Sequence, residues 1–221
     1  MVTSYLFEYS KAYVKFAESR NFKVIAFGED KCNREAVESL IIKQNPDFAV
    51  FNGHGLEEAI CGKKSDSESS APSIEIEDGQ KDEIIVDLDN KNILGSKITY
   101  SVACASAKKL GLEVAEISPK TAFVGYDEDF IFLMDTAHMC RPGTDPIAKA
   151  FLEPSNQVVL SILKGDTAEE AYMKSQGCFQ AWIDYFQSEK AALHDSISIS
   201  WLLLANKKCQ RIHGNKKASL A

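Results

Sequence analysis

Short apolar runs alternate with amphipathic segments along the first half of the chain. Five runs rich in apolar, β-branched and aromatic residues predict strands, at residues 3–10, 22–28, 47–53, 96–106 and 121–126. Three segments between them carry apolar residues on one face at helical spacing, at residues 11–20, 33–46 and 107–118. Near-continuous apolar strands that alternate with helices are typical of a parallel sheet covered by helices on both faces. This half therefore predicts an α/β fold.

The second half of the chain has the longer periodicity of helices. A helix is predicted after Asp145, which has the side chain of a capping residue and is followed by a proline. Residues 165–187 begin with a capping box formed by Thr167 and Glu170, and their apolar stripe is typical of core packing. The apolar segment 196–205 is compatible with a strand or a helix, and the sequence leaves its state open.

One stretch, residues 63–83, differs from its surroundings in composition. It is rich in serine and acidic residues and poor in large apolar residues, which predicts a flexible insertion. Within it, "SIEIE" can pair with the following "EIIVDL" as an edge hairpin. Exposed polar loops are the usual sites of nicking, so we expect the insertion to be disordered or cut during maturation. Lys63, Lys64 and Lys81 are the candidate cleavage positions.

Composition and charge narrow the classes of partner. The 221 residues suit a single domain spanning 1–221, with 45% hydrophobic and 26% charged residues. A net charge of −7 argues against nucleic acid as the main partner. We expect no membrane partner, since no apolar run approaches the roughly 18 residues of a span. No secretory signal pattern is visible, and the six cysteines lack a Cys-x-x-Cys pair, so we expect reduced thiols in a cytoplasmic protein.

His54 stands between two glycines where a predicted strand ends, in "FAVFNGHG". In open α/β sheets, functional residues collect at the carboxyl ends of the strands. Gly53 and Gly55 allow the backbone to turn there and to approach a ligand closely. A histidine in this position is either a turn residue or a general acid and base.

Cys104 ends the next predicted strand of the core, in "ITYSVACAS". The sequence predicts a helix directly after it, and the positive end of a helix dipole would lower the pKa of the thiol. The small neighbours Ala103, Ala105 and Ser106 would leave space for a substrate carbonyl. A single cysteine here is also typical of a buried apolar residue. Two adjacent parallel strands would bring His54 and Cys104 together at one edge of the sheet.

The order and spacing of these motifs resemble those of the clan CD cysteine peptidases, the superfamily of caspases, gingipains and legumains. His54 precedes Cys104 by 50 residues, as in the caspase signature, and the Gly-His-Gly form is most similar to the gingipain branch. The resemblance implies a caspase-like three-layer sandwich with a mainly parallel six-stranded sheet. It implies that Cys104 is the nucleophile and His54 the acid and base. It further implies that the backbone N–H groups of Gly55 and Cys104 form the oxyanion hole.

The chain departs from the caspase pattern around the cysteine. Caspases carry Gln-Ala-Cys-x-Gly, whereas this chain has "VACAS", which argues against specificity for aspartate. The acidic group Asp127, Glu128 and Asp129 follows the last predicted strand and is either a solvated turn or a wall of the substrate pocket. In the second case Asp127 or Asp129 would bind a basic side chain at P1, the substrate residue before the scissile bond. The three lysines of the insertion would then be sites of self-cleavage.

We therefore expect a cysteine endopeptidase that acts on protein or peptide substrates without a cofactor or a metal. His138 and Cys140 lack the second ligand pair of a metal site. Two other classes stay open. One is a catalytically silent, caspase-like binding or scaffold module. The other is a flavodoxin-like ligand-binding domain, although the chain lacks a phosphate-binding glycine motif.

Overall fold

The computed structural model describes residues 2–28, 32–63, 71–75, 81–189, 191 and 196–220. In chain order, its helices and strands are α1 (Val2–Ser19), α2 (Arg34–Gln44), β1 (Phe48–Asn52), β2 (Gly55–Leu56), β3 (Ala59–Lys63), β4 (Ser73–Glu75), β5 (Lys81–Asp87), β6 (Ile98–Val102), α3 (Leu110–Ala115), β7 (Ala122–Tyr126), α4 (Pro146–Leu163), α5 (Ala168–Phe186), α6 (Ser196–Cys209) and β8 (Gln210–Gly214). Short 3-10 turns lie at Lys91–Leu94, Thr136–His138 and Pro142–Thr144.

The strands form two separate sheets. The main sheet has the order β1-β6-β7-β8, in which β1, β6 and β7 are parallel and β8 is antiparallel to β7. A smaller antiparallel sheet has the order β2-β3-β5-β4. The main sheet is mostly parallel, as predicted, but within the described residues it has four strands rather than six. The predicted hairpin between "SIEIE" and "EIIVDL" is present as β4 and β5.

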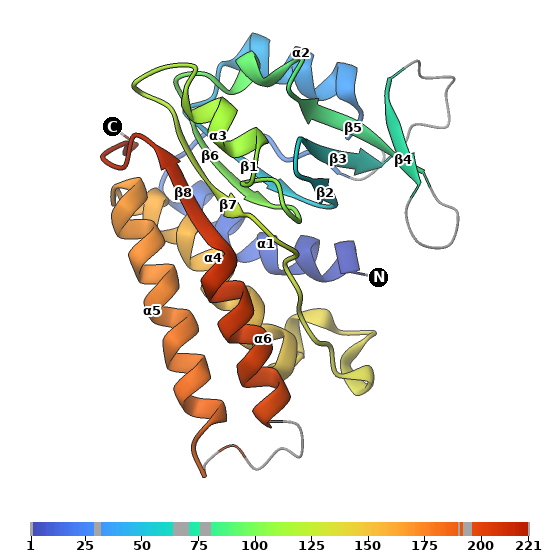
Figure 1. Cartoon of the computed structure of the whole chain (residues 1–221), viewed down its shortest axis with the longest axis vertical. Coiled ribbons are helices and arrows are strands. Elements are labelled where there is room, and N and C mark those ends of the chain that lie inside the picture. The colour runs from blue at the N-terminus through green and yellow to red at the C-terminus, as the bar shows by residue number, and fades with distance from the viewer. Residues whose placement is uncertain are drawn as a thin grey trace.

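Helices cover both faces of the main sheet, and this explains its continuous apolar strands. Phe123 and Val124 are neighbours on β7 and belong to opposite core clusters, because successive side chains of a strand point to opposite faces. The Val124 face packs against α1, α4 and α5. The Phe123 face packs against α2, α3 and the smaller sheet. In Figure 1, α5 and α6 run side by side and extend beyond the sheet.

Residues 3–10, predicted as a strand, form the first part of α1 instead. Tyr5, Tyr9 and Tyr13 recur every four residues, which is the spacing of a helix face, and Tyr5 and Tyr13 are buried in the core. The aromatic composition of this segment favoured a strand, but the four-residue spacing of its tyrosines is that of the helix observed.

The second predicted strand, residues 22–28, is also wrong, because this segment forms no ladder. Phe22 and Val24 pack against the cluster that contains Phe48 and Val50 of β1, and Phe27 packs against the opposite cluster. Its side chains therefore fill both cores like those of a strand, without strand hydrogen bonds. Of the five strands predicted from apolar runs, these two are wrong, and the main sheet gains its fourth strand from β8, which the sequence did not predict.

The helices of the second half follow the sequence closely. Asp145 caps α4 by accepting hydrogen bonds from the amides of Ile147 and Ala148, and α5 begins with the predicted capping box. The segment whose state was open, 196–205, is helical and belongs to α6. None of the helices in the described ranges has the length and apolar composition needed to cross a bilayer.

Candidate active site

The register of β1 and β6 brings the two candidate catalytic residues to one edge of the main sheet. The ladder runs from the pair Phe48 and Ile98 to the pair Asn52 and Val102. His54 and Cys104 each follow their last paired residue by two positions. The two residues therefore stand at equivalent places beyond the carboxyl ends of adjacent parallel strands, which is where open α/β sheets collect functional groups.

His54 is half-buried in the turn that joins β1 to β2, and main-chain hydrogen bonds fix this turn on both sides. The His54 carbonyl accepts a hydrogen bond from the Cys61 amide of β3 at 2.9 Å. The Gly53 amide donates to the Val102 carbonyl of β6 at 3.2 Å. The histidine backbone is thus held between the main sheet and the smaller sheet.

Gly55 lies directly against the residues that carry the candidate nucleophile. A Cβ atom at this position would be 2.7 Å from the Ala103 Cβ and 2.7 Å from the Cys104 carbonyl oxygen. Only glycine fits such a close approach of two chain segments. The glycine thus sets the spacing between the His54 turn and Cys104.

A tight turn follows Cys104, and the predicted helix does not start there. Ala105 has a left-handed backbone with φ 55°, and α3 begins only at Leu110. The Ser106 hydroxyl closes the turn by donating to the Ala103 carbonyl at 2.8 Å. Ala103 and Ser106 are buried in the turn.

The pKa of the Cys104 thiol is raised, whereas the sequence predicted a lowered value. Burial is the main cause, and the charge and hydrogen bonding of the Asp129 carboxylate add to it. A hydrogen bond from the Phe130 amide opposes the rise. The prediction was wrong because the dipole it relied on belongs to a helix that starts at Leu110, away from the sulfur.

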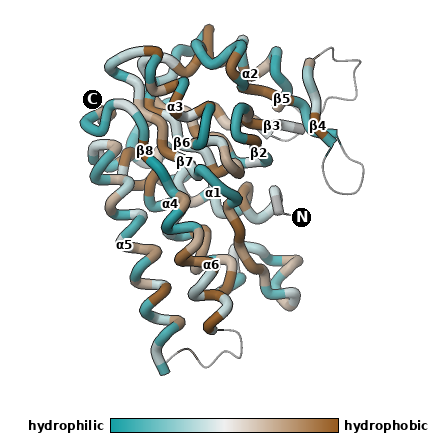
Figure 2. Tube along the Cα trace, in the orientation of Figure 1, coloured by the Kyte–Doolittle hydropathy of each residue, from teal (hydrophilic) through white to brown (hydrophobic). Residues whose placement is uncertain are grey.

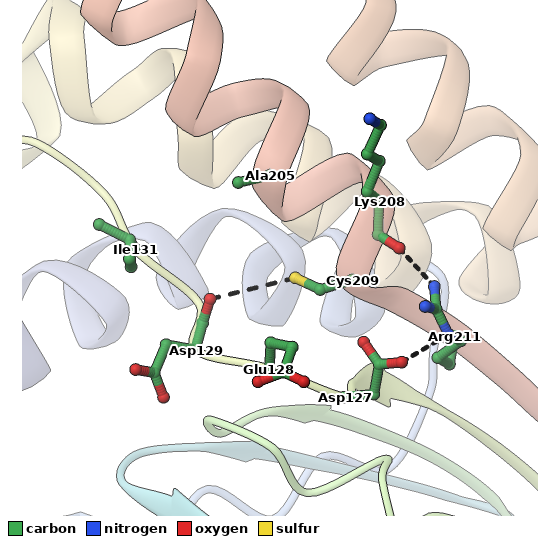
Figure 3. Close-up of a pocket in the computed structure, with 8 residues that line it drawn as sticks. All are labelled: Asp127, Glu128, Asp129, Ile131, Ala205, Lys208, Cys209 and Arg211. Atoms are coloured by element: carbon green, nitrogen blue, oxygen red, sulfur yellow. Dashed lines mark hydrogen bonds and ion pairs between the residues drawn. The ribbon is translucent and has the colours of Figure 1, made fainter.

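The two predicted substrate-binding carboxylates have different surroundings. The Asp127 carboxylate forms an ion pair with the guanidinium of Arg211 of β8, with 2.7 Å between Oδ2 and Nε. The backbone amide of Asp127 donates a hydrogen bond to the Cys209 carbonyl. Asp129 is exposed and forms no ion pair with any residue of the described part of the chain. Figure 3 shows its carboxylate pointing away from Cys209, while its backbone oxygen points toward the Cys209 thiol. Of the two carboxylates, Asp129 is the one whose charge contributes to the raised pKa of the Cys104 thiol.

The acidic segment after β7 lies along a pocket of about 450 Å³, whose other side is formed by the end of α6 and the start of β8. Asn206 of α6 is fully buried and binds both backbone groups of Ile131: its side chain accepts from the amide at 3.0 Å and donates to the carbonyl at 2.6 Å. The loop that leads from the acidic segment toward α4 is strongly apolar (Figure 2), and its residues Phe130 and Phe132 pack among the helices. The segment is therefore held although it belongs to no strand.

Asp82 of β5 is a candidate site residue that the sequence reasoning missed. Burial raises the pKa of its carboxyl group, and the positive charge of His54 opposes this rise, so the two groups interact. Asn206 was missed as well. A polar residue in line with the apolar residues Ile199 and Leu203 on one helix face was the available signal, since such a position is buried and needs hydrogen-bond partners.

The remaining predicted residues lie elsewhere. Lys63 ends β3 and Lys81 begins β5, so both residues of the predicted insertion lie in strands of the smaller sheet, and Lys64 lies outside the described residues. His138 contacts the Thr144 hydroxyl at 3.0 Å, and Cys140 is exposed. Across the described ranges, no group of three or more His, Cys, Asp or Glu side chains is arranged to hold a metal ion.

Comparisons with known proteins do not identify the chain. It matches no protein-family model, no curated protein and no solved structure.

Proposed function

We propose that the protein is a cysteine endopeptidase with a caspase-like sandwich fold and a catalytic pair formed by His54 and Cys104. The observation that carries the proposal is the parallel pairing of β1 and β6, whose register gives both residues the same position at one sheet edge. The left-handed turn at Ala105 adds support, because strained backbone is concentrated at functional sites. All six cysteines are free, which favours a reducing compartment such as the cytoplasm.

The proposed reaction has two stages. The Cys104 sulfur attacks the scissile carbonyl carbon while its proton passes to His54, and His54 then protonates the departing amine as the C–N bond breaks. Water next attacks the thioester and gives a proton to His54; the C–S bond then breaks, His54 returns this proton to the Cys104 sulfur, and the carboxylic acid is released. The backbone N–H groups of Gly55 and Cys104 are proposed to stabilise the oxyanion. Because the pKa of the free thiol is raised, His54 must accept the proton during the attack rather than before it.

A basic residue at P1 is the proposed specificity. Asp127 and Asp129 are both candidates, and we favour Asp129 because Arg211 already neutralises Asp127. A carboxylate about 4 Å from a lysine or arginine is worth roughly 1–4 kcal/mol, depending on desolvation, which is enough for a tenfold to several-hundredfold preference.

The test uses matched fluorogenic peptides that end in Arg, Lys, Asp, Asn or Leu. We expect the wild type to prefer Arg and Lys, the Asp129→Ala variant to lose this preference, and the Asp127→Ala variant to keep it. A preference of the wild type for aspartate or leucine would refute the proposal, and so would a basic preference that both variants retain.

Self-processing at Lys63, Lys64 or Lys81 follows from the same specificity. Lys63 is the first residue of the predicted insertion and pairs with Asp82, the neighbour of Lys81, where β3 meets β5. Intact mass spectrometry of the active protein beside the Cys104→Ala variant tests this. We expect cleavage in the wild type alone, and an uncut insertion in both proteins would exclude self-processing.

A catalytically silent binding or scaffold module is the second candidate. The raised pKa of the Cys104 thiol favours it, since most of the thiol is protonated near neutral pH. Hydrolysis of any peptide of the set, abolished by Cys104→Ala, would exclude this alternative.

A further inference from the structure

We propose that α6 is an interface between two copies of this chain, which pack antiparallel about a two-fold axis near Trp201. The inference goes beyond the proposed peptidase function and does not depend on it. It concerns the side of α6 that faces away from the core.

The buried side of α6 is fully used by the fold. Ile199 and Leu203 pack in the helical core, and the buried Asn206 binds the backbone of Ile131. The opposite side of an ordinary surface helix is polar. Here it carries Ile197 and Trp201, which are 74% and 66% exposed, and both are large apolar residues.

These two residues belong to one continuous stripe, which consists of Ile197, Trp201, Ala205 and Lys208. Their spacing of four, four and three residues places them on one face of the helix, and all four are exposed. In Figure 1, α6 lies toward the viewer and beside α5. Contiguous apolar surface on a folded protein commonly marks a contact site, and tryptophan is enriched among the residues that dominate binding energy.

The exposed charges at the two ends of the stripe are opposite in sign. At the C-terminal end, Lys208 forms no ion pair with any residue that the structure describes. At the N-terminal end, the Ser196 hydroxyl donates to the Ala191 carbonyl at 3.2 Å, which brings the exposed Glu189 close to the start of α6. Glu189 likewise has no ion-pair partner within the described ranges.

A second copy that runs antiparallel matches both ends at once. At about 1.5 Å per residue, Lys208 lies roughly 10 Å beyond Trp201 along the helix axis, and Ser196 lies roughly 8 Å before it. A two-fold axis close to Trp201 therefore brings the two tryptophans together and places Lys208 of each copy beside the partner's Glu189. Each contact then occurs twice, as in any isologous interface. A parallel arrangement would instead set Lys208 against the partner's Lys208.

We expect the association to be weak. Each chain has a net charge of −7, so two copies repel each other at long range and the attraction must come from the stripe itself. A stable interface buries about 800 Å² on each partner, and a single pair of helices buries less. The expected state is a monomer–dimer equilibrium with a dissociation constant in the micromolar range.

Sedimentation velocity over a concentration series measures this equilibrium. The wild type should shift from monomer to dimer, and Trp201→Ala should weaken association by at least about 30-fold, the loss typical of a tryptophan at the centre of an interface. Ile197→Ala should weaken it as well. The matched control is Ile42→Ala on α2, the same substitution at a residue that is 67% exposed on the other face of the main sheet. A wild type that stays monomeric at every concentration would overturn the proposal, and so would a dimer that Trp201→Ala leaves intact.

Charge reversal tests the antiparallel arrangement. Lys208→Glu and Glu189→Lys should each weaken self-association several-fold, because each variant sets like charges together at both ends of the stripe. An equal mixture of the two variants should associate again, because the mixed pair has opposite charges at both ends, and the double variant should behave like the wild type. A mixture that associates no better than the separate variants would overturn the proposal. None of these measurements uses peptide hydrolysis, so failure of the proposed peptidase function would leave their outcome unchanged.

Discussion

The two walls of the candidate site are built from different kinds of interaction. The His54 wall, residues 53–56 with β3 and β5, is held by main-chain hydrogen bonds of the smaller sheet. The Asp129 wall, residues 127–131, belongs to no strand and is held by the Asn206 side chain of α6 and by isolated main-chain hydrogen bonds at Asp127 and Glu128. One wall thus depends on a ladder that many residue types can form, whereas the other depends strongly on one particular side chain.

Because of this difference, we expect substitutions in the two walls to affect the stability of the fold and the proposed substrate specificity to different degrees. A ladder distributes its hydrogen bonds over several residues, so a single substitution in the His54 wall weakens it little unless it removes a buried charge. The Asp129 wall has a buried amide side chain at its centre, and a buried polar group that loses its partner is costly. We therefore expect specificity to be the more fragile property.

The largest effect on peptide hydrolysis is expected from substitutions of Cys104 and His54. Cys104→Ala and His54→Ala should each lower peptide hydrolysis by about 10⁴–10⁶-fold, because they remove the proposed nucleophile and its proposed acid–base partner. Circular dichroism and the melting temperature should stay close to those of the wild type. Full activity in purified Cys104→Ala would refute the site assignment.

The second effect breaks the Asp129 wall alone. Asn206→Ala removes both hydrogen bonds to Ile131 and leaves that peptide without its partner, so we expect a loss of roughly 2–4 kcal/mol in the free energy of unfolding. Urea unfolding measures this loss. The preference for basic P1 residues should fall with it, because Asp129 lies two residues before Ile131.

The matched control for this variant is Asn156→Ala on α4. Asn156 donates one hydrogen bond to the Tyr9 carbonyl at 3.0 Å, at a place away from the site. We expect a loss of about 1 kcal/mol and no change in P1 preference. If both variants leave the preference intact, the anchoring role assigned to Asn206 is wrong.

The sequence predicted those features of the two walls that are encoded within a single segment of the chain. The strands before His54 and Cys104 could be predicted because their apolar runs are continuous: β6 is buried along its whole length, and β1 is mostly half-buried. The parallel pairing then followed from the alternation of strands and helices. The equal offset of the two residues from their strands is visible in the sequence as a spacing of 50 residues.

The parts that could not be predicted depend on contacts between distant segments. Asp82 reaches His54 through the pairing of β3 with β5, and Asn206 reaches Ile131 through the packing of α6. Neither contact leaves a periodic signal. The thiol pKa was predicted in the wrong direction because burial raises it and because α3 starts only at Leu110; helix boundaries are the least certain feature of a sequence pattern.

The third effect breaks the His54 wall. Asp87→Asn should lower the free energy of unfolding by roughly 1–3 kcal/mol, because Asp87 accepts two hydrogen bonds from the Arg34 guanidinium at 2.7 Å and 3.0 Å. Burial raises the pKa of Asp87, but Arg34 and two backbone amides outweigh it, so the pKa lies below its usual range.

The sign of this shift fixes the pH dependence. A lowered pKa in the folded state means that the stabilisation is fully present above the unfolded value near pH 4 and is lost as the pH falls through the folded value. The difference between the wild type and Asp87→Asn in urea unfolding should therefore be largest at pH 7 and should shrink toward pH 2. The exposed pair of Glu169 and Lys216 gives the control: Glu169→Gln should change stability by less than about 0.5 kcal/mol.

The smallest effect concerns the turn that connects the two walls. Ala105 has a left-handed φ of 55°, which costs an alanine roughly 1–2 kcal/mol and costs glycine almost nothing. Glycine gains more freedom in the unfolded chain, which offsets about 0.4–1 kcal/mol of this benefit. Ala105→Gly should therefore stabilise the fold by roughly 0.5–1 kcal/mol in urea unfolding. Ser96→Gly is the comparison, since Ser96 has a φ of 59° at a position away from the site, and this variant also loses the hydrogen bond from the Ser96 hydroxyl to Ser118. Ala105→Gly should therefore gain more stability than Ser96→Gly, and only Ala105→Gly should slow peptide hydrolysis, by a few-fold, because the stiff turn fixes the backbone next to Cys104. Unchanged hydrolysis in Ala105→Gly would mean that the strain at this turn has no role in positioning the nucleophile.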